Sequence, residues 1–176
     1  MKKISMITLG LLLTAAQVNA AEASDGTISF TGNIESQTCA VSVNGGTSSA
    51  TVPLPTVASG LLKTSGQTAG DTRFTLALSN CETKTGNVYA YFEQTANVNA
   101  NGRLTNTGSA TNVDLQLLDK NGKEINAGSA DQTTSPATEA LDAGAATLTY
   151  IARYFATAAA TSGTVASSVT YSISYL

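Results

Sequence analysis

Apolar and polar side chains alternate with a period of two along most of this chain. In residues 26–34, for example, Ile28, Phe30 and Ile34 are apolar, and the residues between them are small or polar. The same alternation recurs in residues 39–43, 74–78, 88–92, 113–117, 146–155 and 165–175. This period places successive side chains on opposite faces of a β-strand. The sequence therefore predicts an all-β protein and no helix beyond the first twenty residues.

The segments between the predicted strands contain turn signals. Asn121-Gly122 follows one strand directly and supplies the positive φ angles of a tight hairpin, so we predict a hairpin over residues 119–123. Pro53 and Pro55 interrupt an alternating stretch, which suits an edge or irregular strand. Residues 95–111 predict a long surface loop or a ragged hairpin, and residues 128–144 a connection.

The number and spacing of these strands indicate one two-layered domain. Several short strands separated by turns are typical of an immunoglobulin-like β-sandwich. The chain has no tryptophan, so the Cys, Trp, Cys signature of antibody domains does not apply. A β-barrel is the alternative that periodicity alone leaves open.

The first twenty residues have the features of a secretory signal peptide. Lys2 and Lys3 precede a mostly apolar run over residues 4–16, and small side chains at Val18 and Ala20 suit signal peptidase. We expect cleavage after Ala20. The competing interpretation is a membrane anchor, but the run is shorter than the roughly 20 residues that a spanning helix needs.

Two cysteines lie in the part of the chain that we expect to be exported. In an oxidising compartment Cys39 and Cys81 are expected to form a disulfide, and the alternative is two free thiols. Such a bridge would close a loop of about 43 residues and contribute roughly 4 kcal/mol in the chain-entropy model.

Composition argues against catalysis and against nucleic-acid binding. Without Lys2 and Lys3, seven basic residues face twelve acidic ones, a net charge of −5 that disfavours nucleic acid and anionic bilayers. Histidine is absent, so a Ser-His-Asp triad or a zinc-type histidine cluster cannot form. The carboxylates fall mostly in turn-like segments, so we interpret them as solvated surface groups and not as a catalytic acid–base pair. We therefore expect no enzyme, no metal and no cofactor.

The six tyrosines have two interpretations. Aromatic residues could form a sugar-binding platform, but they also pack well on half-buried strands. The second interpretation is favoured because all six lie within alternating segments: Tyr89, Tyr91, Tyr150, Tyr154, Tyr171 and Tyr175.

Amphipathic strands are predicted close to both ends of the exported chain. Unpaired strands near chain ends are templates for pairing with another chain, and strand addition to a sheet edge is a known recognition mode. Pairing of the first strand within its own domain is an equal alternative on periodicity alone.

Particular residues of this chain resemble the major pilins of the bacterial chaperone–usher pathway, of the type 1 and long polar fimbria kind. The resemblance covers essentially the whole exported chain. The matching pieces are residues 26–34 leading to Cys39-Ala-Val41, Ser109–Val113 leading to Gln116–Asp119, Ala152–Thr157, Gly163 as the fourteenth residue from the end, and the penultimate Tyr175.

The resemblance implies an incomplete immunoglobulin-like sandwich, the pilin fold, which lacks its last strand and is completed in trans by a donor strand. It divides the chain into a signal peptide (1–20), a donor-strand extension (21–33) and a pilin domain (34–176). Donor side chains facing the neighbour's groove would be Ser24, Gly26, Ile28, Phe30 and Gly32. The C-terminal strand that borders the groove and contacts the chaperone would include Gly163, Val165, Val169, Tyr171, Ile173, Tyr175 and Leu176.

The same resemblance implies partners and a location. The expected partners are a periplasmic pilus chaperone, an outer-membrane usher and neighbouring copies of the subunit. The chain would pass through the periplasm to the fimbrium on the cell surface, where the fibre supports adhesion, with a host-surface receptor contacted through the fibre. The alternative is a minor adaptor or adhesive subunit with its own receptor-binding surface, although the chain is too short for an added lectin domain.

Overall fold

The structure is a computed structural model, and it describes Ser29, Thr31 and residues 39–176. The predicted donor residues Ser24, Gly26, Ile28, Phe30 and Gly32 lie outside the described residues. The chain divides into two units, Met1–Glu35 and Ser36–Leu176, and the following description concerns the second. Within the described part, no helix has the length and apolar character needed to cross a membrane.

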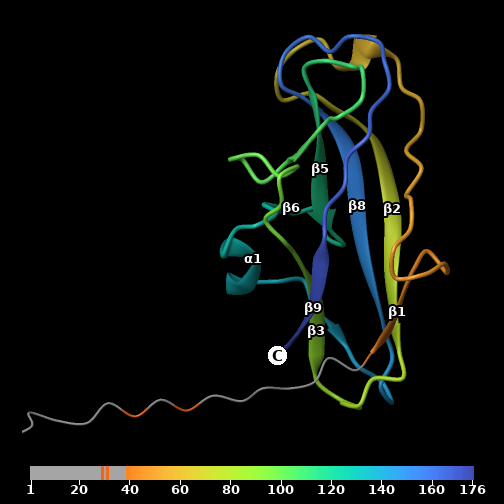
Figure 1. Cartoon of the computed structure of the whole chain (residues 1–176), viewed down its shortest axis with the longest axis vertical. Helices are drawn as coiled ribbons and strands as arrows, with labels where there is room; N and C mark the ends of the chain where they lie inside the picture. Colours follow the sequence, from red (N-terminus) through yellow and green to blue (C-terminus); the bar gives the residue numbers. More distant parts are fainter. Residues whose placement is uncertain (1–28, 30, 32–38) are drawn as a thin grey trace, which may run out of the picture. The chain divides into compact units, whose positions relative to one another are not determined.

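The larger sheet has six strands and is antiparallel throughout. Its main path runs in the order β1 (Ala40–Val43), β2 (Thr68–Ser79), β8 (Ala146–Ala156), β5 (Val113–Asp119) and β4 (Leu104–Thr105). The short β6 (Glu124–Ile125) also pairs with β5. The two longest strands, β2 and β8, lie side by side and pair with each other in this sheet (Figure 1). Its long strands come from the alternating segments, as expected.

The smaller sheet has three strands in the order β7 (Glu139–Ala140), β3 (Asn87–Phe92) and β9 (Tyr171–Tyr175). Strand β9 pairs with β3 along its whole length, from Phe92 opposite Tyr171 to Val88 opposite Tyr175. Within the described residues, β3 is the only strand that pairs with β9, and β2 is the only strand that pairs with β1. Each sheet therefore ends in an edge strand, β1 in one and β9 in the other.

The core lies between the two sheets, where the apolar side of each alternating strand is buried. Leu76 and Leu148 from the larger sheet and Val88 and Phe92 from the smaller one are at most 2% exposed. The ring of Tyr150 packs edge-on against Phe92, with 5.1 Å between centroids. Burial of such side chains contributes roughly 1.5–3 kcal/mol each, so the packing of the two sheets provides most of the stability.

The predicted hairpin at residues 119–123 is confirmed. The backbone N–H of Asp119 donates to the carbonyl of Lys123 at 2.9 Å, and Gly122 has a φ of +83°. One carboxylate oxygen of Asp119 also accepts the backbone N–H groups of Asn121 and Lys123. The hairpin places β6 beside β5.

Two segments differ from the sequence predictions, and a third follows one of its two predicted alternatives. The last alternating segment is a strand only at β9, while residues 164–170 are irregular. Of the two alternatives for residues 95–111, the ragged hairpin is confirmed, because Val98 forms an antiparallel bridge with Leu104 of β4. The expected connection 128–144 contains β7 and a four-residue helix, α1 (Asp131–Thr134). A 3-10 turn, Ser59–Leu61, follows the irregular stretch that carries the two prolines. Alternation reports which side chains face inward, and it does not require that the backbone pairs with another strand.

Candidate functional site

A groove of about 690 Å³ opens between the two edge strands. Its lining includes Val41 and Val43 of β1 and Tyr171 of β9. In Figure 1 the irregular segment before β2 runs along one side of the larger sheet, and the segment leading into β9 runs across the front of β8. The groove therefore lies where each sheet lacks a neighbouring strand.

The floor of the groove is made of apolar core side chains. They come from β2, β3, β4, β5 and β8, and none is more than 8% exposed. These floor residues are Phe74, Leu76, Phe92, Leu104, Leu115, Leu117 and Ala152. An extended peptide that covered such a floor with apolar side chains would gain hydrophobic stabilisation.

One rim of the groove is the irregular segment 48–55, and two tyrosine hydroxyls hold it. Tyr171 donates to the carbonyl oxygen of Ser48 at 2.8 Å, and Tyr154 donates to the carbonyl oxygen of Pro55 at 3.1 Å. Prolines lack a backbone N–H, so Pro53 and Pro55 cannot donate to a ladder. This rim accordingly belongs to no strand.

The opposite rim is the segment that leads into β9, and the loop 106–111 holds it in place. The carbonyl of Thr164 accepts the N–H of Ala110 at 3.0 Å, and the carbonyl of Ala166 accepts the N–H of Thr107 at 2.8 Å. A Cβ atom on Gly163 would lie 2.5 Å from the backbone nitrogen of Ala110. Gly163 thus permits a close approach of two backbones that any side chain would obstruct.

The structure places the predicted C-terminal residues in different surroundings. Val169 and Tyr171 line the groove, whereas Ile173 is buried in the core and Val165 packs against it. Tyr175 lies beside the disulfide, with its hydroxyl 3.0 Å from the sulfur of Cys39. The side chain of Leu176 is exposed, and its backbone pairs with Asn87.

A disulfide joins Cys39 and Cys81, with a Cα–Cα distance of 4.0 Å. Cys81 is fully buried, and the bond links the start of β1 to the segment after β2. These two strands already pair, with Ala40 opposite Ser79. The bond therefore fixes one end of the edge strand that borders the groove.

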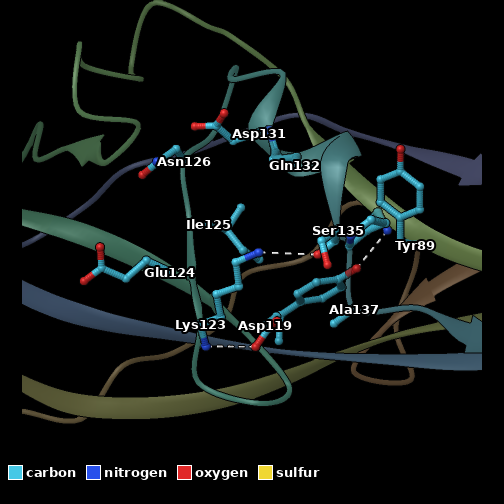
Figure 2. Close-up of a pocket in the computed structure, with 13 residues that line it drawn as sticks. Tyr89, Asp119, Lys123, Glu124, Ile125, Asn126, Asp131, Gln132, Ser135 and Ala137 are labelled. Atoms are coloured by element: carbon cyan, nitrogen blue, oxygen red, sulfur yellow. Dashed lines mark hydrogen bonds between the residues drawn. The ribbon is translucent and has the colours of Figure 1, made fainter.

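A second, smaller pocket of about 180 Å³ lies beside β3 and α1 (Figure 2). Several of its polar groups already have partners within the protein. Lys123 donates to the carbonyl oxygen of Ser135, and the amide of Gln132 bonds to both backbone groups of Phe92. The hydroxyl of Tyr150 accepts the N–H of Ala90 at 2.8 Å. The bonds from Gln132 and Tyr150 therefore pair backbone groups of β3 that lie beyond the short strand β7. The polar groups of this pocket thus serve the fold.

Sequence reasoning did not identify the floor of the groove or the rim at residues 48–55. Alternation indicates that Leu76 and Leu115 face inward, but it cannot show which inward side chains lie at an open groove. That property depends on the absence of a strand neighbour for β1 and β9. The two prolines were the available signal for an irregular rim.

A comparison with known protein families shows which family this sequence belongs to. Residues 28–176 match the family model described as fimbrial protein. The chain belongs to the fimbrial protein family. This match covers both rims and the floor of the groove.

Curated relatives of this fimbrial protein extend over nearly its whole length. The F17 fimbrial protein of Escherichia coli is 45% identical over 183 residues, which cover 99% of each chain. The major fimbrial subunit SMF-1 of Stenotrophomonas maltophilia is 46% identical over 172 residues, 93% of this chain and 99% of the relative. Both relatives are named as fimbrial proteins and not as enzymes.

Solved structures support the same fold. The antigen and type I fimbria protein of Burkholderia pseudomallei is 26% identical, with a TM-score of 0.55 over 79% of this chain and 95% of that one. The P pilus rod subunit PapA has a TM-score of 0.59 over 78% of this chain and 99% of its own, at 15% identity. The all-β pilin fold predicted from the sequence is confirmed.

Proposed function

We propose that this fimbrial protein is a structural shaft subunit that polymerises by donor-strand exchange. The groove between β1 and β9 supports this proposal, because it has an apolar floor between two strands that lack a second neighbour. A strand inserted there would pair with β9 and cover Leu76 and Leu115. The isolated domain is then an incomplete sandwich that a neighbouring copy completes.

The occupant is the extension at residues 21–33 of a second copy, after removal of residues 1–20 as a signal peptide. The alternation in this extension places Ile28 and Phe30 on one face, with Gly26 and Gly32 on the same side. A periplasmic chaperone fills the groove first, and the usher then exchanges it for the extension of the next subunit. The fibre reaches the cell surface and supports adhesion. The free energy of completing the sandwich drives assembly without catalysis.

Electrophoresis of exported protein in SDS, with and without boiling, tests this proposal. We expect a ladder of polymers that boiling converts to monomer, because strand-exchanged subunits are held by burial and hydrogen bonds alone. A single monomer band from unboiled wild-type protein would count decisively against the mechanism. A ladder from a variant that lacks residues 21–33 would show that another segment joins the subunits.

A matched pair of substitutions locates the donor face. Phe30→Asp puts an unpaired charge into an apolar groove, so we expect polymers that dissociate at markedly lower temperature. Thr31→Asp adds the same charge to an exposed side chain on the other face and should leave the ladder unchanged. Equal ladders from the two variants would refute the proposed facing of the extension.

A further inference from the structure

One polar residue occupies an inward position on the rim that leads into β9. Along this rim Val165, Val169 and Tyr171 face the core and pack against it. Ser167 occupies the same side of the alternation, is half-buried and lines the groove. The alternation of this segment would place an apolar side chain at this position, so a hydroxyl group here requires an explanation.

The hydroxyl oxygen of Ser167 is buried and has no hydrogen-bond partner among the residues that the structure describes. Buried hydroxyl groups in native proteins are usually paired, because an unpaired one loses its bonds to water and gains nothing in return. A nearby serine shows the usual situation: Ser172 on β9 donates to a carboxylate oxygen of Glu93 at 2.7 Å. In the open subunit the hydroxyl of Ser167 therefore remains able to form a hydrogen bond that no described residue provides.

We propose that Ser167 is a positioning residue for the inserted strand: its side chain rotates so that the hydroxyl turns into the groove and bonds to a main-chain group of that strand. This inference rests on the proposed function, in which the occupant is the extension of a second copy. Four of the five residues on the inward face of that extension have no polar side-chain atom: Gly26, Ile28, Phe30 and Gly32. Main-chain groups are therefore the main partners for the hydroxyl, and the glycines allow the backbone to approach closely.

The two states of the subunit then respond to the loss of this hydroxyl in opposite ways. In the monomer, Ser167→Ala removes a buried polar group without a partner, so its resistance to urea should stay the same or rise. In the polymer, the same substitution removes a hydrogen bond between subunits. We expect dissociation about fivefold faster, the change that a hydrogen bond of ordinary net strength gives. If Ser167 only stabilised the fold of the subunit, Ser167→Ala would weaken both the monomer and the polymer.

The experiment uses exported full-length subunits, separated into monomer and polymer by gel filtration. Urea unfolding reports on the monomer, and the dissociation rate in guanidinium reports on the polymer. Ser172→Ala is the control, because its bond to Glu93 lies within one subunit and its loss should weaken the monomer. An unchanged dissociation rate for Ser167→Ala, or a loss of monomer stability, would overturn the role of Ser167. Wild-type chains that form no polymer would instead overturn the proposed function itself.

Discussion

The hydroxyl of Tyr171 donates a hydrogen bond of 2.8 Å to the carbonyl oxygen of Ser48, which joins the two rims of the groove. Tyr171 begins β9, and Ser48 belongs to the irregular segment before β2. Tyr154 of β8 holds the other end of that segment through Pro55. The rim is thus fixed at both ends by side chains.

The first prediction concerns this contact between the rims. Tyr171→Phe keeps the ring and removes the hydroxyl, so we expect a protease of broad specificity to cleave residues 47–52 faster. Because Ser48 is exposed, the free energy of unfolding should fall by less than about 1 kcal/mol. Limited proteolysis followed by mass spectrometry of the fragments measures the effect. Tyr154→Phe is the matched control and should accelerate cleavage near Val57 instead; the same pattern of fragments in both variants would contradict the assignment.

The second prediction concerns Gly163. A Cβ atom there would lie 2.5 Å from the nitrogen and 2.8 Å from the Cα of Ala110, so Gly163→Ala forces two backbones apart. We expect the free energy of unfolding to fall by about 1–3 kcal/mol, the usual range for overpacking. Urea unfolding of the monomer provides the measurement.

Gly60 offers a control for the same chemical change. A Cβ atom on Gly60 would have Lys63 as its nearest neighbour, 3.7 Å away at the end of a flexible side chain. Gly60→Ala should therefore leave stability nearly unchanged. If Gly163→Ala were equally harmless, the close approach to Ala110 would not constrain this position.

Much of the fold could be predicted from the sequence, because the alternation reports burial directly. Strands β2, β3, β5 and β8 all lie where apolar side chains recur at every second residue. The hairpin at Asn121-Gly122 could be predicted for a separate reason, since its backbone needs positive φ.

The segment before β9 shows where this reasoning stops. Residues 164–170 keep the alternation of a strand, yet the loop 106–111 supplies the bonding partners of Thr164 and Ala166, among them the side chain of Asn106, which accepts the N–H of Ala166. Pairing of the backbone depends on contacts with residues more than fifty positions away, and a local pattern carries no information about them. For the same reason the sequence indicated an amphipathic C-terminal strand but not the floor of the groove beside it.

The third prediction concerns stability at alkaline pH and rests on Tyr150. Burial raises the pKa of its hydroxyl from 10.0 to about 12, an effect that the nearby carboxylates of Asp119 and Glu139 reinforce and that the bond from Ala90 opposes. The folded protein therefore holds the Tyr150 proton more tightly than the unfolded chain. Because the folded pKa is the higher one, stability is fully present below pH 10 and is lost as the pH rises towards 12.

Tyr150→Phe isolates this effect, because every other titrating group stays the same. At pH 8 the variant should be less stable by about 1–3 kcal/mol, since the N–H of Ala90 loses its acceptor. Between pH 10 and 12 the wild-type protein should lose roughly 2 kcal/mol more than the variant, because at pH 12 only half of the folded Tyr150 is ionised and the full equivalent of two pKa units needs a higher pH. Urea unfolding at pH 8, 10 and 12 should therefore show two curves that converge. A constant difference across this range would mean that Tyr150 has the same pKa in the folded and unfolded chains, so that its burial does not oppose ionisation.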